Sequence, residues 1–355
     1  MAAKVIFFRI GGTSVQYNNI FAIETSCDDT SIAIVKEGRK VLTSIVSSQI
    51  AVHQPFGGVV PEIASRHHLE NIAFVSETAL AEAKITFQDV DAFAVTYGPG
   101  LVGSLLVGVS YAKALAYALN KPLIPIHHLE GHLYAGFLEK EDYSFPLLAL
   151  IVSGGHTTLL IMHDHGKYEI IGITRDDAAG EAFDKISRVL GLGYPGGPFI
   201  QKIAEQGNPS AIKFPRAWLE KGSFDFSFSG VKSSVINFLH NAKQKGEEIN
   251  DADIAASFQE ALVEVLVTKT MQAAKQYNVK NILIAGGVAS NTKLRSQMHS
   301  FAKANNLLCH FPSPKYCTDN AAMIACAAFY TSHFKEHDTS MDLNAIPYQV
   351  LPRRI

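Results

Sequence analysis

The sequence predicts an α/β protein with two related lobes around a central cleft, and three observations support this fold class. Apolar strand-like runs alternate with helical patterns along the chain, which is typical of α/β proteins. The same strand–turn–strand pattern occurs twice, and no linker rich in Pro or Ser separates the two halves. Because ligands commonly bind in clefts between closely packed lobes, we expect the functional site in such a cleft.

The repeated pattern occupies residues 20–35 (IFAIETSCDDTSIAIV) and 147–162 (LLALIVSGGHTTLLIM). Each copy has an apolar strand, a tight turn of small and polar residues, and a second apolar strand. Ser26 aligns with Ser153 at an offset of 127 residues that is constant across the pattern. Two hypotheses remain open, namely two unrelated hairpins or a duplicated lobe with a phosphate-facing turn in each copy.

Periodicity and apolar runs place the other elements in chain order. Helices are predicted over 61–83, 101–119, 129–140, 177–190, 230–245 and 253–277. Strands are predicted over 92–96, 123–126 and 281–285. The most apolar helix, 101–119, contains Lys113 as well as glycines and serines, so a buried helix is favoured over a membrane span.

The composition is that of a globular chain. The 355 residues are 47% hydrophobic and 18% charged, which excludes a disordered chain, a coiled coil and a collagen-like repeat. With 31 Lys+Arg against 33 Asp+Glu, the formal net charge is −2. This balance excludes a protein that binds nucleic acid by bulk attraction. RNA would have to meet a local patch, and its binding to the chain alone should be weak and salt-sensitive.

One segment has the composition of such a patch. Residues 213–218 (KFPRAW) mix basic and aromatic side chains and contain the only tryptophan, with Lys221 and Lys232 nearby. A core aromatic surrounded by solvated lysines explains the same pattern equally well.

The cysteines and the N-terminus bear on the compartment. The four cysteines form no C-x-x-C pair, which suits a reducing cytosol better than a disulfide scaffold. The first 23 residues contain two basic residues and no acid, a pattern compatible with a transit peptide. A short extra arm is the favoured interpretation, so we expect a cytoplasmic protein, with organellar import as the alternative.

His128 and His132 are the first candidate chemical motif. On a helix, residues four apart lie on one face, so the pair can hold one divalent metal. The motif differs from the H-E-x-x-H of metalloproteases, because Glu130 is two residues after the first histidine and points away. Two hydrogen-bonded histidines at a helix start remain the alternative. The spacing alone does not identify a third ligand.

Several turns are rich in glycine. Residues 98–103 match G-x-G-x-x-G, but no acid follows at the distance that a dinucleotide site requires, so we expect only a sharp turn. The turns at 153–155, 193–198 and 286–287 have the small residues that let phosphates reach backbone N–H groups. Together they suggest a bound nucleotide.

The segment 176–185 (DDAAGEAFDK) is rich in acids. Asp177, Glu181 and Asp184 would share one helical face, where their mutual repulsion favours a hydroxyl-rich partner such as ribose. The alternative is a solvated face on which Glu181 pairs with Lys185.

In order along the chain, these motifs resemble those of one family, TsaD, the tRNA N6-adenosine threonylcarbamoyltransferases, in its bacterial and organellar form. The strings that carry the resemblance are IETSCDDTSIAIV, GGVVPEIASRHHLE, TYGPGLVGSLLVG, HHLEGHLYA, IVSGGHT, DDAAGEAFDK, YPGGP, GGVASNTKLR and CTDNAAMIA. They cover about residues 20–334. No tyrosine precedes the Ser-Gly-Gly turn, and this departure favours the bacterial branch.

The resemblance implies the actin-like ATPase (ASKHA) fold. The first lobe would comprise 20–130 and 319–345 and the second 131–318, with an arm at 1–19 outside the family core. The implied reaction transfers threonylcarbamoyl from threonylcarbamoyl-AMP to the N6 amine of the adenosine 3′ of the anticodon. The tRNAs concerned read codons that begin with adenine.

The resemblance also implies the site residues. His128, His132 and Asp319 would hold one Fe²⁺ or Zn²⁺ ion. The positions that match those for the adenylate ligand are Ile151, Val152, Ser153, Gly154, Gly155, Asp184, Gly197 and Asn291. We add the hypothesis that Asp28, in the first hairpin, assists deprotonation or orients the substrate.

The implied partners are tRNA together with TsaB and TsaE, or a second copy of the chain if the protein is organellar; no membrane is expected. Three other functions stay open. An ATPase or small-molecule kinase of the same fold would need Mg²⁺, which prefers oxygen ligands to histidine. A peptidase is disfavoured by the position of Glu130. A non-catalytic scaffold of a tRNA-modifying complex is the third.

Overall fold

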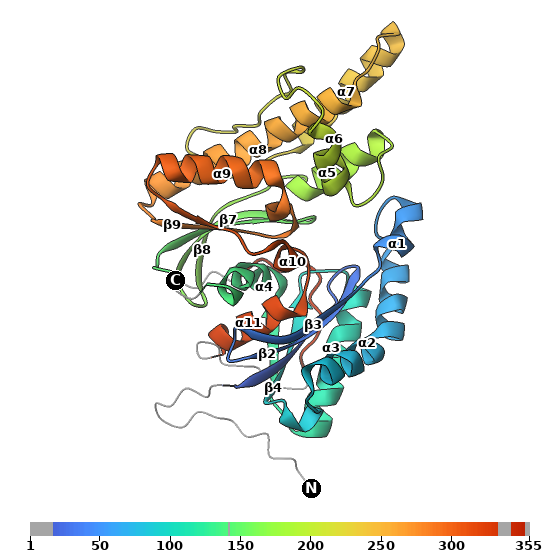
Figure 1. Cartoon of the computed structure of the whole chain (residues 1–355), viewed down its shortest axis with the longest axis vertical. Helices are drawn as coiled ribbons and strands as arrows, with labels where there is room; N and C mark the ends of the chain where they lie inside the picture. Colours follow the sequence, from blue (N-terminus) through green and yellow to red (C-terminus); the bar gives the residue numbers. More distant parts are fainter. Residues whose placement is uncertain (1–16, 141–142, 333–341, 352–355) are drawn as a thin grey trace. The chain divides into compact units, whose positions relative to one another are not determined.

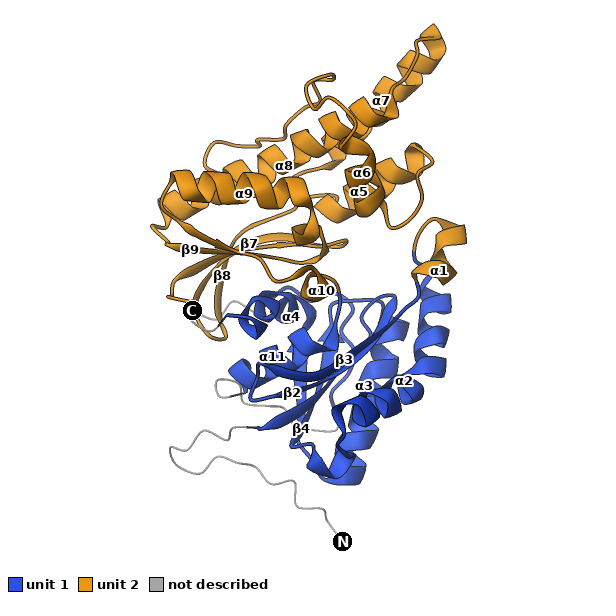
Figure 2. Cartoon of the chain, viewed as in Figure 1, with its two compact units in different colours: residues 1–49, 59–141, 319–352 blue, residues 50–58, 142–318, 353–355 orange. Residues whose placement is uncertain are grey.

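The computed structural model describes residues 17–140, 143–332 and 342–351 (Figure 1). Most of the arm expected at 1–19 therefore lies outside the described residues. The chain forms two compact units (Figure 2). Unit 1 comprises Met1–Gln49, Val59–Glu141 and Asp319–Pro352, and unit 2 comprises Ile50–Gly58, Asp142–Thr318 and Arg353–Ile355.

Unit 1 is built on a five-stranded sheet with the order β3-β2-β1-β4-β5. Its strands are β1 (Asn19–Glu24), β2 (Asp29–Lys36), β3 (Lys40–Ser48), β4 (Ala92–Gly98) and β5 (Leu123–His127). β1, β2 and β3 pair antiparallel, whereas β1, β4 and β5 pair parallel. The carboxyl ends of three neighbouring strands therefore meet at one edge of the sheet.

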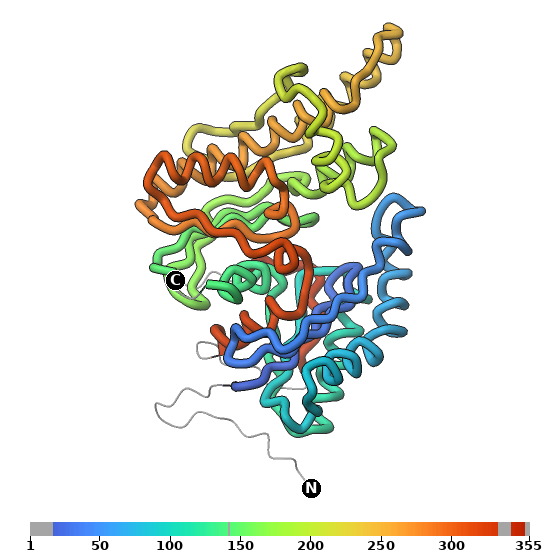
Figure 3. The backbone as a smooth tube through the Cα atoms, viewed as in Figure 1, coloured from blue at the N-terminus to red at the C-terminus, as the bar shows by residue number. Residues whose placement is uncertain are grey.

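Four helices cover this sheet. They are α2 (Pro61–Ala83), α3 (Val102–Leu119), α4 (His128–Ala135) and α11 (Ala321–Thr331). Phe21 and Ile23 of β1 share a buried cluster with side chains of α2 and α3. The alternate residues Ile20 and Ala22 are also buried, and α11 contacts β1 and β2 (Figure 3). Because both faces are covered, β1 is apolar almost throughout rather than alternating.

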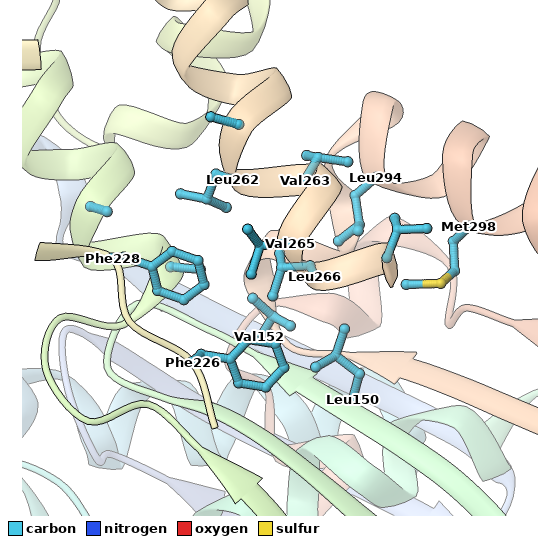
Figure 4. Close-up of a cluster of buried hydrophobic side chains, with 14 of the residues drawn as sticks. Leu150, Val152, Phe226, Phe228, Leu262, Val263, Val265, Leu266, Leu294 and Met298 are labelled. Carbon is cyan, nitrogen blue, oxygen red and sulfur yellow. The ribbon is translucent and has the colours of Figure 1, made fainter. Parts of the chain in front are cut away.

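Unit 2 has a second five-stranded sheet, with the order β10-β9-β6-β7-β8. Its strands are β6 (Leu147–Val152), β7 (Thr157–Asp164), β8 (Lys167–Ile173), β9 (Asn281–Ala285) and β10 (Leu308–His310). Its helices are α1 (Ile50–His53), α5 (Ala179–Val189), α6 (Gly196–Ala204), α7 (Ser229–Lys245), α8 (Asp251–Gln276), α9 (Thr292–Ala304) and α10 (Pro314–Cys317). Figure 4 shows the core of this unit, where β6, α8 and α9 meet and Phe226 and Phe228 pack against them.

The two sheets have the same topology, with β6 to β10 in the places of β1 to β5. The register repeats at the offset seen in the sequence. The pair Ile20–Val35 corresponds to Leu147–Met162, which is 127 residues further on for both members. This agreement favours the duplicated lobe over two unrelated hairpins.

The chain path differs from the predicted one at the helix with the two histidines. α4 begins at His128 and ends at Ala135, and a 3₁₀ turn follows over Gly136–Leu138, in place of one helix over 129–140. The whole of α4 belongs to unit 1, whereas the predicted first lobe ends at residue 130, inside this helix. α4 belongs to unit 1 because it packs closely on α11. The approach is so close that a Cβ on Gly131 would lie 2.6 Å from Ile324 Cδ1.

α3 is long and apolar enough to cross a membrane by length and composition. In unit 1 it packs against β4 and α2, but only 33% of it is buried, so it is a partly exposed helix rather than the buried one expected. Its start follows the 98–101 turn, where Leu101 N–H donates a hydrogen bond of 2.8 Å to the carbonyl oxygen of Ser26. The G-x-G-x-x-G segment thus connects the turn of the first hairpin to α3.

Two adjacent glycines at the end of β9 provide a test of the unit 2 packing. Gly286 has φ +93°, and a Cβ there would collide with the backbone carbonyl of Val152, whereas a Cβ on Gly287 would meet nothing within 4 Å. Gly286→Ala should lower the free energy of unfolding by roughly 3 kcal/mol. Gly287→Ala, the matched control, should change it by less than about 0.5 kcal/mol. Urea unfolding of the full chain measures both, and equal stability of the two variants would contradict the packing described.

Candidate functional site

The two histidines lie where β5 passes directly into α4. His127, the last residue of β5, caps the helix by accepting a hydrogen bond of 3.2 Å at Nδ1 from Leu129 N–H. His128 and His132 then face the same side, one turn apart, with ring centroids 4.7 Å from each other. Both are buried.

Asp319 approaches the histidines from the start of α11. The helix cap fixes its position: Asn320 accepts a hydrogen bond of 2.9 Å from Met323 N–H, and Ala321 N–H donates one of 2.9 Å to Ser31 Oγ of β2. Asp319 Oδ1 lies 3.5 Å from His128 Nε2 and 3.2 Å from His132 Nε2. Two segments almost two hundred residues apart in sequence therefore converge at one point.

These three residues have the properties of a metal site. One ligand atom from each lies within 4.8 Å of the others. The side chain of His132 is fully buried, and apart from the contact of Nε2 with Asp319 its ring nitrogens have no hydrogen-bond partner among the described residues. Such a group is costly unless something else satisfies it. A two-histidine, one-carboxylate set suits Fe²⁺ or Zn²⁺, so the residues fit the ion that the family resemblance implies.

Negative charge accumulates around this point. Burial, reinforced by the carboxylates of Asp319, Asp28 and Glu24, raises the pKa of Asp29 to about 7 against an opposing hydrogen bond from Ser48. Burial and the nearby aspartates also raise the pKa of the Cys27 thiol well above its usual value. A bound cation would relieve this repulsion.

The same carboxylates act on the pKa of His128. Burial disfavours its charged form, but the carboxylates of Asp319 and Glu24 outweigh burial and raise the pKa of the imidazole. In the same way, burial alone would raise the pKa of Glu24, yet the charge and hydrogen bond of His128 lower it. Sequence reasoning missed Glu24; the signal was a single acid at the end of the apolar run IFAIE.

Two further acids of unit 1, Glu130 and Asp28, were considered from the sequence. Glu130 is buried on α4, but among the described residues it is not part of the metal-ligating group. Asp28 lies in the turn between β1 and β2, where its backbone carbonyl accepts a hydrogen bond of 3.0 Å from Gln49 N–H. Its negative charge helps to raise the pKa values of the neighbouring Cys27 and Asp29.

The residues expected to bind the adenylate all lie in unit 2. Ile151 and Val152 end β6, and Ser153, Gly154 and Gly155 form the turn to β7. Gly154 and Gly155 are exposed. Gly180 N–H at the start of α5 donates to the Ser153 carbonyl at 3.2 Å. The turn therefore lies beside α5, which carries Asp184.

The other three adenylate positions have structural contacts of their own. Asp184 Oδ1 accepts a hydrogen bond of 2.6 Å from Gly196 N–H and so fixes the start of α6, where Gly197 follows. Asn291 is nearly buried and caps α9 through Leu294 N–H at 3.0 Å. Its amide also donates to Gln259 Oε1 at 2.7 Å. Asn291 thus acts first as a helix cap.

The expected acidic face at 176–185 is not formed by Asp177. α5 begins at Ala179, so Asp177 precedes the helix. It pairs with Lys232 and, at 3.0 Å, with Lys185. Burial would raise the pKa of Asp177, but these lysines lower it. Glu181 pairs with Lys185 at 2.7 Å, as the alternative held. Asp177 and Glu181 are thus paired with lysines, whereas Asp184 accepts its hydrogen bond from Gly196 N–H.

The basic and aromatic segment lines a hollow of about 1070 Å³ in unit 2. Lys213 and Trp218 are exposed in it, whereas Phe214 is buried. Arg216 pairs with Glu264 at 2.8 Å, and Lys232 is occupied by Asp177. The exposed Lys213 and Trp218 therefore fit the interpretation as an RNA patch, whereas the buried Phe214 fits the interpretation as a core aromatic.

Comparison with known proteins gives one family. A sequence model described as "TsaD: tRNA N6-adenosine threonylcarbamoyltransferase" matches residues 40–326. A relative from Moorella thermoacetica is 61% identical over 329 residues, covering 93% of this chain and 96% of its own length. One from Clostridioides difficile is 58% identical over 327 residues, covering 92% and 96%. Both bear the name tRNA N6-adenosine threonylcarbamoyltransferase.

Solved structures agree on the fold. HypF from T. kodakarensis matches 90% of this chain and 48% of its own, with TM-score 0.61 and 14% identity. Component A of (R)-2-hydroxyglutaryl-CoA dehydratase from Acidaminococcus fermentans matches 90% and 99%, with TM-score 0.52 and 13% identity. These are proteins of the actin-like ATPase fold, which confirms the fold class.

The metal site predicts the behaviour of one substitution. His132→Ala removes one of the three candidate ligands, so metal content should fall from stoichiometric to near zero. His67→Ala, on α2 and outside the cluster, should retain the parent's metal content. Elemental analysis of the purified, folded proteins measures both. Full metal content in the His132 variant would place the ion elsewhere.

Proposed function

Because this chain belongs to the TsaD family of tRNA N6-adenosine threonylcarbamoyltransferases, we propose that His128, His132 and Asp319 form its metal centre and that threonylcarbamoyl is transferred there. The chain modifies tRNA at the N6 amine of an adenosine. The donor is threonylcarbamoyl-AMP, and the acceptor is the adenosine 3′ of the anticodon in tRNAs that read codons beginning with adenine.

The observation that carries this proposal is the convergence of the three ligands in a chain with such close relatives. His128 and His132 come from α4, whose start is capped by His127, and Asp319 directly precedes Asn320, the cap of α11. The resident ion is Fe²⁺ or Zn²⁺. When bound, it neutralises anionic oxygens of the donor and polarises the carbonyl that is attacked.

The adenylate of the donor would lie against unit 2. The Ser153-Gly154-Gly155 turn, whose two glycines are exposed, would offer backbone N–H groups to the phosphate. Asp184 and Gly197, at the junction of α5 and α6, would face the ribose hydroxyls, and Asn291 would hold the backbone that follows β9 in place. Ile151 and Val152 end the strand that presents this turn.

Asp28 is the candidate for handling the proton of the acceptor amine. The exocyclic amine of adenine is a weak nucleophile, so a carboxylate that orients it or accepts its proton lowers the barrier. Asp28 lies in the β1–β2 turn of unit 1, the unit that also holds the three metal ligands. Release of AMP from the donor supplies the driving force for the transfer of threonylcarbamoyl.

The partners follow from the family and from two surfaces. We assign TsaB and TsaE as protein partners, with self-association as the alternative. α2 and α3, which pack together in unit 1, expose large apolar side chains, among them Leu69, Phe74 and Tyr117. The exposed Lys213 and Trp218 in the hollow of unit 2 suit contact with RNA.

The relatives are bacterial, so we place the protein in the bacterial cytoplasm.

The direct test supplies pre-made threonylcarbamoyl-AMP and tRNA to the full chain, with and without the partner set. The parent should form threonylcarbamoyladenosine. Asp319→Asn removes the carboxylate ligand and should lower the rate by at least about 100-fold. Glu248→Gln, an exposed position in unit 2, is the matched control and should keep the parent rate. Mass spectrometry of nucleosides from the digested tRNA provides the readout.

Other outcomes separate the alternatives. ATP turnover with a small substrate but no transfer would identify a kinase. Neither activity, with stable tRNA or partner binding, would identify a scaffold. Transfer at the parent rate by the Asp319 variant would remove the metal centre from the mechanism.

A further inference from the structure

Glu24 is a fully buried carboxylate that the proposed chemistry does not use. It is the last residue of β1, and its exposed fraction is 0%. Burying a carboxylate is costly unless other groups compensate its charge and satisfy its lone pairs. The contacts of Glu24 therefore indicate what it does.

Each oxygen of this carboxylate has a donor. Oε1 accepts a hydrogen bond of 2.5 Å from Ser26 N–H, and Oε2 accepts one of 2.6 Å from the Thr96 hydroxyl of β4. Oε2 also lies 3.1 Å from His128 Nδ1, the first residue of α4. Ser26 Oγ lies 3.2 Å from the same nitrogen. Glu24 thus connects the carboxyl ends of β1, β4 and β5.

The contact with His128 decides which ring nitrogen is available. A carboxylate only accepts hydrogen bonds, so the proton of the imidazole lies on Nδ1, facing Glu24. Nε2, which lies 3.5 Å from Asp319 Oδ1, is then the nitrogen that can bind an ion. His132 contacts Asp319 Oδ1 through Nε2 at 3.2 Å, but in the described part of the chain its Nδ1 has no hydrogen-bond partner like Glu24. The two histidines are therefore held in different ways.

We propose that Glu24 is a positioning residue for the metal centre. It holds His128 in the tautomer with Nδ1 protonated, fixes the ring with Nε2 toward Asp319, and contributes negative charge that balances the ion. This inference rests on the metal centre of the proposed function. A hydrogen-bonded carboxylate behind a metal-ligating histidine raises the basicity of the ligand, so Glu24 strengthens metal binding without touching the ion.

A purely structural role is the alternative. In that case Glu24 would only tie β1 to β4 through Thr96, and its loss would lower stability without altering the ion. Thr25 provides the matched control. It is the adjacent residue, is equally buried, and donates a hydrogen bond of 2.9 Å to the Ser104 carbonyl on the α3 side. Thr25→Val removes a buried hydrogen bond at the same strand end but leaves His128 untouched.

The experiment compares Glu24→Gln, Glu24→Ala and Thr25→Val in the full chain. Metal affinity is measured by chelator competition with Co²⁺, and the visible spectrum of the bound Co²⁺ reports ligand geometry. Urea unfolding gives the stability of each apo protein. Glu24→Ala should weaken metal binding by roughly 10- to 100-fold and shift the Co²⁺ bands. Glu24→Gln keeps the shape and one acceptor but loses the charge, so its affinity should fall between those of Glu24→Ala and the parent.

Thr25→Val should lose stability yet bind Co²⁺ with the parent's affinity and spectrum. Parent-like affinity and spectrum in both Glu24 variants would overturn the positioning role, even if transfer and metal binding by the parent are intact. Equal weakening by Thr25→Val would also overturn it, because the effect would then be structural. If Glu24→Ala does not fold, Glu24→Gln decides alone. A parent that binds no metal would overturn the metal centre, and this inference with it.

Discussion

The parallel pairing of β1 with β4 and of β4 with β5 is the constraint on which the site depends. It brings three strand ends to one edge of the sheet in unit 1, the edge where ligands bind in open α/β sheets. β5 passes without a loop into α4, so His128 emerges beside Glu24. α11 is anchored to β2 through Ser31 and carries Asp319 to the same edge. The two candidate histidine ligands are thus placed by a strand end, and Asp319 by the anchored segment that precedes α11.

The second unit repeats this plan with different residues. Its β6–β7 pairing matches that of β1–β2 register for register, but the two turns have diverged. The turn after β1 holds Cys27 and Asp28, with Asp29 at the start of β2, whereas the turn after β6 has Gly154 and Gly155. An acidic turn suits a nearby cation, and a glycine turn suits a phosphate. Duplication followed by this divergence gives the two units turns of different chemistry.

The sequence was most informative where local patterns determine structure. The helix over 61–83 and the strand over 281–285 were predicted with the bounds they have, because their periodicity and flanking residues are unambiguous. The repeat was visible because apolar pairing sets the register. The prediction of Asp177 on a helix was wrong, because α5 begins at Ala179 and Asp177 pairs with two lysines before the helix cap. Glu24 was missed because its partners Thr96 and His128 are distant in sequence, and only the strand order brings them together.

The proposed metal centre binds one ion through His128, His132 and Asp319. Anomalous diffraction from crystals of the metal-loaded protein, recorded on both sides of the iron and zinc absorption edges, locates such an ion. We expect a single peak bonded to His128 Nε2, a nitrogen of His132 and an oxygen of Asp319, with His128 Nδ1 facing Glu24. A peak at other residues, or coordination through His128 Nδ1, would contradict it.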